Sequence, residues 1–301
     1  MPPKPDLIGH RGGEQLGPEN TIEVAETALN HGIVGWEVDI AISLDGVPFL
    51  MHDSNLKRTT NVEEVFPDRE NERADSFTWS ELRKLNAGSW YVDSDPWALI
   101  ATGAISKETA QNYENAKIPS FSEVLNFTRF HDLILDFDTR HPPEGHPYRE
   151  DFVEILFDMT LNSGMDLNKV MIPTSSDEWL DRIDSHGVAE IWTYRDYINT
   201  GDGYTNEEYR KLYEDEVPVM VYTIDSTERF HQLWCLGVRW VKTNAPHKFD
   251  GVKKPAWYLR MEIYLLIWSL TSASVVLLAI FKGWKHHEHE EKSGNKNKPE
   301  R

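Results

Sequence analysis

Cysteine is almost absent from this sequence of 301 residues, in which Cys235 is the only one. An intrachain disulfide is therefore excluded, and a chain of this length can bury a large core without one. We expect Cys235, in a helix-like stretch, to lie in that core. Positive charge is also scarce, because 31 lysines and arginines face 50 aspartates and glutamates, for a net charge of −19. So acidic a chain repels phosphate backbones, and we expect no nucleic-acid partner.

Long hydrophobic runs are missing from the first 250 residues, and no apolar stretch of the signal-peptide kind follows the N-terminal MPPKPD. Near the C-terminus, residues 263–281 (IYLLIWSLTSASVVLLAIF) carry no charge and are apolar on every face. A helix of this length approaches the roughly 30 Å hydrocarbon thickness of a bilayer. We expect a transmembrane helix with its flanks at 253–282 and a polar charged tail at 283–301.

The residues beside this run bear on its place in a bilayer. Trp257, Tyr258 and Trp284 lie at its ends, as in an interfacial aromatic belt. More cationic residues follow the run than precede it, which favours a cytosolic tail. The expected location is a single-pass membrane protein, with the main domain luminal or extracellular.

Strand and helix signals alternate through residues 1–252. Helix starts are expected at Asn20 with Glu23, at Thr78 with Glu81 and at Ser120 with Glu123, each pair having the capping-box spacing. Strand-like runs lie at 7–9, 34–43, 47–53, 132–138, 169–175, 189–194, 217–224 and 238–244. We expect one α/β domain over residues 1–252, built as a (β/α)₈ barrel or as a doubly wound sheet.

Two segments depart from this alternation. Residues 86–117 are irregular and rich in Gly, Ser and Asp, so we expect an insertion outside the core. Residues 195–216 connect two strand-like runs and contain a helix-like segment but no strand signal. A complete barrel needs helix, strand and helix there, so we expect the sixth strand to be missing or reduced.

Carboxylates share one face on two predicted strands. In GWEVDI, Glu37 and Asp39 alternate with apolar residues, and in LILDFDTR, Asp136 and Asp138 do the same. An isolated pattern of this kind is typical of a solvent-facing edge strand, but two such strands, each fully apolar on its other face, indicate carboxylates pointing into a barrel. Their mutual repulsion there favours a hard divalent cation with oxygen ligands.

His10 and His52 each follow a strand-like run directly, so in a barrel both lie at the carboxyl-terminal rim where such enzymes place catalytic groups. Either histidine alone is more typical of a structural residue. Two beside a carboxylate cluster form an acid and base pair. The guanidinium of Arg11 matches a phosphate or carboxylate, and together these groups suit phosphodiester cleavage.

At this point the motifs resemble those of the glycerophosphodiester phosphodiesterases, in order and spacing, over residues 6–250. The matching motifs are HRG at 10–12, PENT at 18–21, E-x-D at 37–39, DG at 45–46, HD at 52–53, RTT at 58–60, IPSFSEVL at 118–125 and DFDTR at 136–140. RKLNAG at 83–88 and TGDG at 200–203 are consistent with the animal membrane-anchored branch of that family. The resemblance implies a TIM barrel of the phospholipase C-like phosphodiesterase type.

The resemblance also implies roles for single residues. His10 and His52 are the expected acid and base, with the direction of proton transfer open, and Arg11 and Arg140 are the expected phosphate ligands. Arg140 stands where the family usually has lysine. Glu37, Asp39 and Asp138 are the expected ligands of one Mg²⁺ or Ca²⁺. Tyr222 and Asn244 replace a tryptophan and an aspartate that are usual in the last two strands.

The activity implied is hydrolysis of glycerophosphodiesters to glycerol 3-phosphate and an alcohol, through attack of the neighbouring glycerol hydroxyl on phosphorus and a cyclic phosphate. Lysophospholipids would yield lysophosphatidic acid in the same way. The alternative is a membrane-tethered domain without activity that keeps the motif and binds a lipid or a partner. The filled acid, base and metal positions favour the enzyme, and the missing strand favours the alternative. The expected partners are the substrate and, through the C-terminal helix, the lipid bilayer.

Overall fold

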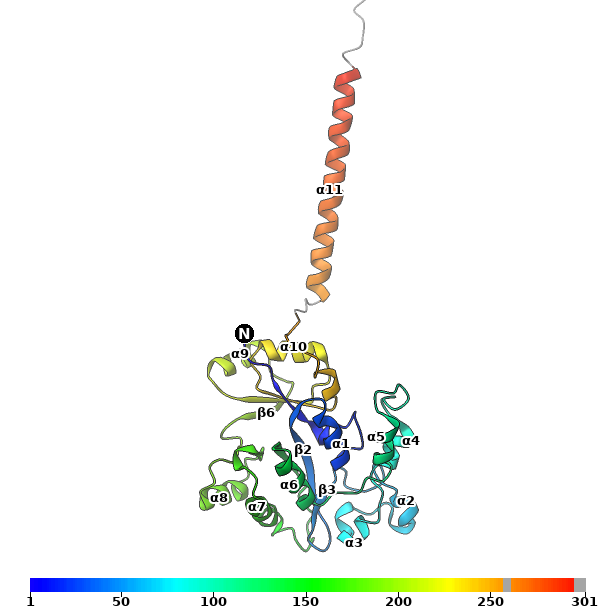
Figure 1. Ribbon diagram of the computed structural model, residues 1–301. Coiled ribbons are helices and arrows are strands. Elements are labelled where there is room, and N and C mark those ends of the chain that lie inside the picture. Colours follow the sequence, from blue (N-terminus) through cyan, green and yellow to red (C-terminus); the bar gives the residue numbers. More distant parts are fainter. Residues whose placement is uncertain (257–260, 295–301) are drawn as a thin grey trace, which may run out of the picture. The chain divides into compact units, whose positions relative to one another are not determined.

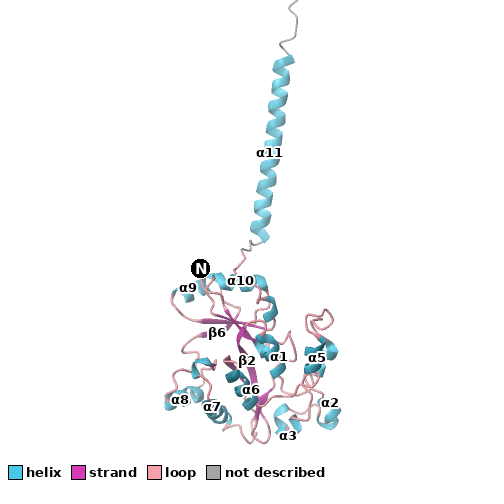
Figure 2. Cartoon of the chain, viewed as in Figure 1, coloured by secondary structure: helices cyan, strands magenta, loops and turns pink. Residues whose placement is uncertain are grey.

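The computed structural model describes residues 1–256 and 261–294, and the chain divides into two compact units, Met1–Pro255 and Ala256–Arg301. In the first unit the strands lie in the middle and helices surround them (Figure 2). The strands are β1 (Asp6–Gly9), β2 (Ile33–Ile42), β3 (Pro48–Leu50), β4 (Ile134–Thr139), β5 (Val170–Met171), β6 (Ile198–Gly201), β7 (Val219–Tyr222) and β8 (Trp240–Thr243).

The helices of this unit connect and cover the strands, and α2 to α5 gather on one side of it (Figure 1). They are α1 (Ile22–Leu29), α2 (Val62–Val65), α3 (Trp79–Leu82), α4 (Ser89–Ser94), α5 (Lys107–Tyr113), α6 (Phe121–Phe130), α7 (Phe152–Asn162), α8 (Asp177–His186), α9 (Asn206–Glu214) and α10 (Thr227–Cys235). Short 3₁₀ helices are η1 (His10–Gly12), η2 (Pro67–Arg69), η3 (Ala74–Ser76), η4 (Leu167–Lys169) and η5 (Pro246–Lys248).

Local sequence explains most of the helix starts. Thr78 with Glu81 and Ser120 with Glu123 form the two capping boxes predicted at α3 and α6. The prediction for α1 is wrong by one residue, because the hydroxyl of Thr21, not Asn20, accepts from the backbone of Val24. The side chain of Asn20 is bonded instead to β2.

The sheet is a curled parallel ladder with strand order β5-β4-β2-β1-β8-β7-β6, and β3 pairs antiparallel with β2. Its seven parallel strands are one short of a complete eight-stranded barrel. Within the described residues, β5 and β6 share no ladder. An isolated parallel bridge between Met171 and Trp192 lies on the β5 side of this opening. The expected barrel with a strand deficit is therefore confirmed.

The deficit lies at a different place than predicted. Residues 189–194 were expected as a strand but form only the bridge at Trp192, and residues 198–201, expected to contain no strand, form β6. Counted along the parallel strands, the fifth is reduced and the sixth is present. The polar, glycine-containing β6 carries no strand signal of its own. It forms because its backbone pairs with β7.

The inner face of the sheet begins with an apolar layer at the amino-terminal ends of the strands. Ile8, Met220 and Trp240 are buried there, and the ring of Tyr197 packs against Trp240. Trp192 contacts the same Trp240 ring with an edge-to-face centroid distance of 5.4 Å. Aromatic rings thus fill the space beside the missing strand.

Residues 86–117 contribute buried side chains to the core although many of their residues are exposed, so the prediction of an insertion outside the core is wrong for these side chains. Tyr91 and Tyr113 are fully buried, and their hydroxyls donate to the backbone carbonyls of Gln15 and Leu16. The irregular sequence hid this role, because the partners lie 76 and 97 residues away along the chain. The two tyrosines hold the loop that follows β1. Cys235 is exposed, not buried, because α10 turns Phe230, Leu233 and Trp234 inward.

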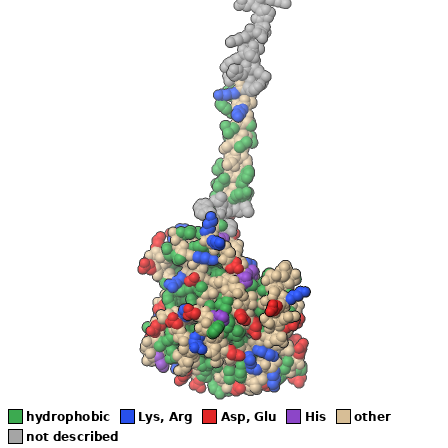
Figure 3. Space-filling model, viewed as in Figure 1, with side chains coloured by type: hydrophobic (Ala, Val, Ile, Leu, Met, Phe, Trp, Pro, Cys, Tyr) green, Lys and Arg blue, Asp and Glu red, His purple; other side chains and the backbone are tan. Residues whose placement is uncertain are grey.

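The second unit contains the helix α11 (Met261–Gly294). Residues 262–285 are long and apolar enough to cross a membrane, with a mean hydropathy of 2.2 over the most apolar window, and none of that window is buried. Hydrophobic side chains run along this helix in Figure 3. The helix continues past residue 282, where the tail was expected to begin. Trp284 is exposed on it, whereas Trp257 and Tyr258 lie outside the described residues.

Candidate active site

The site begins at the carboxyl end of β1, where the chain turns sharply. Arg11, Gly12 and Gly13 have positive φ angles of 50°, 85° and 98°. At Gly12 a Cβ atom would lie 2.6 Å from a side-chain carbon of Val24, so this close approach to α1 requires glycine. The turn places His10 and Arg11 at the rim of the sheet.

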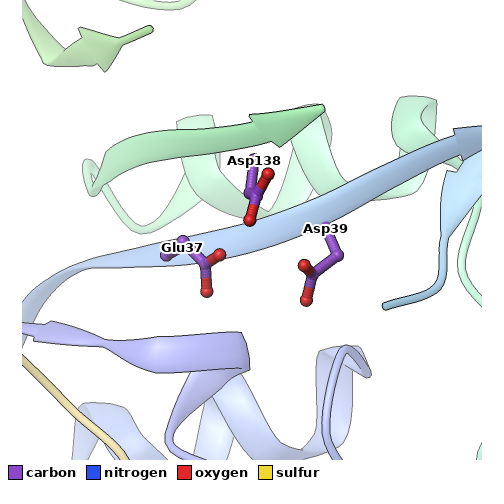
Figure 4. A group of neighbouring side chains, drawn as sticks. All are labelled: Glu37, Asp39 and Asp138. Atoms are coloured by element: carbon purple, nitrogen blue, oxygen red, sulfur yellow. The ribbon is translucent and has the colours of Figure 1, made fainter. Parts of the chain in front are cut away.

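Glu37, Asp39 and Asp138 come together on the inner face of the sheet, on the neighbouring strands β2 and β4 (Figure 4). Asp39 pairs in register with Asp138, so the two side chains lie next to each other. One oxygen from each of the three carboxylates lies within 4.8 Å of the others. Sequence parity predicted this cluster, and the parallel register assembles it.

The carboxylates are costly to bury together. Burial and then the like charge of Asp39 raise the pKa of Glu37 well above its ordinary value. Burial and then Asp39 also raise the pKa of Asp138. Asn20 holds Asp39 in place, because its amide donates to Oδ2 at 2.8 Å and its oxygen accepts from the Asp39 backbone at 3.1 Å.

Arg11 and Arg140 reach the same carboxylates from the rim. Nε of Arg11 lies 3.3 Å from Oδ2 of Asp39, and Nη1 of Arg11 lies 3.1 Å from Glu19. Arg140 is paired with Asp39 and, at 3.1 Å, with Asp138. Both guanidinium groups therefore lie directly beside the acidic cluster.

The ring of His10 is oriented by a chain of hydrogen bonds from β8. The amide nitrogen of Asn244 donates to Asp225 at 2.9 Å, so its Oδ1 faces His10 Nδ1, 2.5 Å away. Because that oxygen can only accept, His10 carries its proton on Nδ1 and leaves Nε2 as an acceptor. Nε2 lies 3.8 Å from Glu37. Burial lowers the pKa of His10 to about 4, which keeps the ring neutral.

His52 follows β3 and is oriented by its neighbour. Its Nδ1 donates to Asp53 at 2.7 Å, and Asp53 is in turn held by Arg58 at 2.7 Å. The hydrogen bond from Arg58 lowers the pKa of Asp53 to about 2, so this carboxylate stays charged. His52 and Arg140 line one cavity of about 660 Å³. His52 therefore lies at the same end of the sheet as Arg140, the predicted site residue with which it shares this cavity.

A buried ion pair below the cluster was not predicted. Lys242 on β8 lies 2.6 Å from Asp136 on β4, and both side chains are buried. Burial lowers the pKa of Lys242, but the attraction of Asp136 and Glu37 outweighs it, so the pKa is raised and the amine stays charged. The alternation of Trp240, Lys242 and Asn244 along β8 was the available signal, since it turns all three inward.

The donor set fits a hard divalent cation. Three carboxylates from adjacent strands offer up to six oxygen ligands, with neither sulfur nor imidazole among them, as Mg²⁺ and Ca²⁺ prefer. Burial and then the like charge of Asp39 raise the pKa values of Glu37 and Asp138, and a bound cation would oppose both effects.

Comparison with known proteins agrees with this geometry. The family model described as the glycerophosphoryl diester phosphodiesterase family matches residues 10–176, which include all seven predicted site residues. The chain belongs to the glycerophosphoryl diester phosphodiesterase family. The resemblance of the sequence motifs is therefore confirmed.

Two animal members of the phosphodiesterase family are similar over 93% of this chain. The glycerophosphoinositol inositolphosphodiesterase GDPD2 of Mus musculus is 34% identical over 298 residues, which are 53% of its length. The glycerophosphodiester phosphodiesterase domain-containing protein 5 of Homo sapiens is 34% identical over 293 residues, 48% of its length. The chain thus spans about half the length of these relatives.

Solved structures of the phosphodiesterase family share the fold. The glycerophosphodiester phosphodiesterase of Agrobacterium tumefaciens is 19% identical with a TM-score of 0.59, covering 82% of this chain and 100% of that one. A phosphodiesterase of Oleispira antarctica, solved with the product sn-glycerol-3-phosphate, is also 19% identical with a TM-score of 0.58, covering 82% and 95%. The barrel expected from the sequence is confirmed by these likenesses.

Proposed function

We propose that this chain is a metal-dependent phosphodiesterase that hydrolyses glycerophosphodiesters to glycerol 3-phosphate and a free alcohol. The observation that carries the proposal is the meeting of three carboxylates, two oriented histidines and two arginines at one end of the sheet. The name of the mouse relative, an inositolphosphodiesterase of glycerophosphoinositol, supports the same substrate class.

The hydrogen bonds support different roles for the two histidines. His10 is neutral and presents an unprotonated Nε2, so it suits the base that takes the proton of the attacking glycerol hydroxyl. His52 donates through Nδ1 to the charged Asp53, which orients its ring as a carboxylate orients the histidine of a catalytic triad, so it suits the acid that protonates the leaving alcohol.

The chemistry then follows in two balanced steps. The glycerol hydroxyl attacks phosphorus while its proton moves to His10, and the bond to the head group breaks as its oxygen takes the proton of His52. Water next opens the cyclic phosphate, with the two histidines exchanging roles. Arg11 and Arg140 offset the charge on the phosphate oxygens.

Glu37, Asp39 and Asp138 would hold the cation. When bound, a divalent cation supplies a positive charge that polarises the phosphoryl group. We propose Mg²⁺ or Ca²⁺, since both accept an all-oxygen ligand set.

The test is a product assay on the full chain purified in detergent. We expect release of glycerol 3-phosphate from glycerophosphoinositol with Mg²⁺ or Ca²⁺ and its loss with a chelator. A parallel assay with lysophosphatidylcholine tests for lysophosphatidic acid. His52→Ala is expected to lower kcat/KM by about 10²–10⁴-fold, the usual contribution of acid–base catalysis.

The matched control is His186→Ala, since His186 is an exposed histidine at the end of α8. If the wild type shows no more activity than His52→Ala on either substrate class, the enzyme is ruled out. The non-catalytic, membrane-tethered lipid- or partner-binding domain then remains.

We also propose that α11 anchors the chain in a membrane by a single span, with the main domain luminal or extracellular. The uncharged surface of residues 263–281 supports the anchor, and the cationic residues after it support the orientation. Protease protection in sealed vesicles tests both. If protease added on the cytosolic side digests the main domain, the proposed orientation is wrong. If alkaline carbonate extracts the protein from the membrane, the proposed anchor is wrong.

A further inference from the structure

Asp225, just after β7, joins that strand to β8 and to the loop that follows β1. Its Oδ1 accepts from the Thr243 hydroxyl at 2.8 Å and from the Asn244 backbone at 2.9 Å. Its Oδ2 accepts from the side-chain nitrogen of Asn244 at 2.9 Å and from that of Gln15 at 3.4 Å. Four donors thus converge on this carboxylate.

Only a group that accepts at both positions satisfies this arrangement. An ionised carboxylate accepts at each of its two oxygens, whereas an amide offers one acceptor and one donor. The carboxylate of Asp225 therefore fixes the amide of Asn244, whose nitrogen must face Oδ2 and whose oxygen must face the other way, toward His10. The reverse orientation would bring two oxygens together without a proton between them.

The orientation of Asn244 decides which nitrogen of His10 carries the proton. Oδ1 of Asn244 lies 2.5 Å from His10 Nδ1 and accepts the hydrogen bond there, which leaves Nε2 free. A carboxylate at position 244 would accept in either orientation, but an amide accepts on one side only. The asparagine therefore depends on a second residue to fix it, and Asp225 is that residue.

We propose that Asp225 is a positioning residue for the phosphodiesterase reaction, which sets the tautomer of His10 by fixing the orientation of the Asn244 amide. It acts through Asn244, whose side chain bonds to Asp225 with its nitrogen and to the imidazole with its oxygen. The inference rests on the proposed function, because a free Nε2 serves catalysis only if His10 is the base.

Asp225→Asn tests the inference, because it keeps the shape of the side chain and exchanges one acceptor for a donor. The Thr243 hydroxyl and the Asn244 backbone both donate to Oδ1, so the new amide oxygen stays there and the new nitrogen replaces Oδ2. Two amide nitrogens would then face each other, and the Asn244 amide is expected to turn round. Its nitrogen then donates to His10 Nδ1, and the imidazole proton moves to Nε2.

The first readout is the kinetics of the full chain in detergent with Mg²⁺ and glycerophosphoinositol. In Asp225→Asn, kcat should fall by about 10²–10⁴-fold, the usual contribution of general base catalysis. KM should change little, because the proposed phosphate ligands Arg11 and Arg140 are untouched.

The double variant Asp225→Asn/Asn244→Asp exchanges the amide and the carboxylate between the two positions. The new amide nitrogen donates to the new carboxylate, and that carboxylate accepts from His10 Nδ1. We therefore expect the double variant to recover most of the kcat that the single variant loses.

The second readout is the tautomer itself and needs no activity. Nuclear magnetic resonance of the chain labelled with ¹⁵N in its histidines separates a ring nitrogen that bears a proton from one that does not, and His10→Ala assigns the His10 signals. The wild type and the double variant should carry the proton on Nδ1, and Asp225→Asn should carry it on Nε2.

Asp250→Asn is the matched control, because Asp250 accepts from Nδ1 of His31 at 2.8 Å outside the site. It should change the signals of His31 but neither kcat nor the signals of His10. Thermal unfolding checks that each variant is folded, and the double variant alone decides if Asp225→Asn does not fold.

A wild type without activity would defeat the proposed function, and the tautomer measurement would still decide whether Asp225 sets the state of His10. An unchanged tautomer of His10 in folded Asp225→Asn would overturn the inference. A folded double variant that carries the His10 proton on Nε2, or that is as slow as the single variant while the wild type is active, would overturn it as well.

Discussion

Two parts of the sheet differ sharply in how they are held together. In the part formed by β1, β2 and β4, here called the continuous part, each strand has a parallel ladder to the next. The ladder of β1 with β2 has one register shift between Leu7 and Ile8, and β2 pairs with β4 from Gly35 to Ile40 without a shift. In the part around β5 and β6, β5 pairs with β4 over two residues and reaches the following chain only through the bridge at Trp192.

The proposed metal ligands and one proposed catalytic histidine lie on the continuous part, since Glu37, Asp39 and Asp138 come from β2 and β4 and His10 follows β1. Side chains that must stay within a few tenths of an ångström need a rigid backbone, which a paired ladder provides. Beside the interruption, the ring of Trp192 packs against the rings of Tyr197 and Trp240. The ladder that aligns Asp39 with Asp138 is thus retained although the fifth strand of the barrel is reduced to the bridge at Trp192.

The largest expected effect tests whether the continuous part carries the chemistry. Asp39→Asn removes the charge that joins β2 to both arginines, so kcat/KM should fall by about 10²–10⁴-fold. Calorimetric titration should show weaker binding of Mg²⁺. Asp68→Asn, on the exposed surface, is the control. If the Asp39→Asn variant keeps kcat/KM within threefold of the wild type, Asp39 does not take part in the reaction.

The next effect concerns the ion pair that joins β4 of the continuous part to β8, where Lys242 is paired with Asp136. Lys242→Met leaves a buried carboxylate without a partner and should destabilise the fold by about 3–5 kcal/mol. Thermal unfolding in detergent measures this. Lys242→Met/Asp136→Leu should recover most of the loss, and a double variant no more stable than the single one would refute the ion-pair explanation.

A smaller effect is expected in the interrupted part. Trp192→Ala removes the ring that contacts Tyr197 and Trp240 beside the opening, at a cost of about 3 kcal/mol. The Tm should fall by roughly 6–12 °C for a domain of this size. The folded fraction should keep its kcat/KM within about threefold. A large loss of activity below the Tm would show that the two parts are not independent.

The smallest effect depends on pH and lies beside the site. Burial, and then the charge of Glu19, raise the pKa of Glu14 to about 7, while Arg11 and Arg58 oppose the shift and Asp225 adds to it. The protonated Glu14 side chain therefore makes its whole contribution to the free energy of unfolding below about pH 4.5, and this contribution is lost as the pH rises through 7.

Glu14→Gln should consequently be more stable than the wild type at pH 8 by on the order of 2 kcal/mol and no more stable at pH 4.5. Tm measured at both pH values checks the sign. The control is Glu150→Gln, on the surface of the same unit. A stabilisation equal at both pH values would assign the effect to something other than titration.

Much of the site could be predicted from local sequence. Strand parity places Glu37 with Asp39 and Asp136 with Asp138, and the chain order of the motifs indicates the family. The capping boxes at Thr78 and Ser120 were equally predictable, because a cap needs only residues three positions apart.

The errors share a physical cause. Asn20 has the pattern of a helix cap but bonds to Asp39, and residues 86–117 lack a hydrophobic period but bury Tyr91 and Tyr113. In each case the partner is distant along the chain, so no local pattern contains the information. The strand predicted at 189–194 is reduced and the unpredicted strand β6 is present for the same reason, because β6 forms through its pairing with β7.

By itself, the sequence determined which residue types face one another: alternating carboxylates on two strands, a histidine after each of two strands, and one uncharged run long enough for a membrane. These features follow from backbone periodicity and composition, which every local segment carries. Only the tertiary structure decided that Asn244 fixes the proton of His10 and that Lys242 neutralises Asp136. Those contacts join the end of the chain at β8 to the segment after β1 and to β4, and they form only when the sheet curls and brings these strands together.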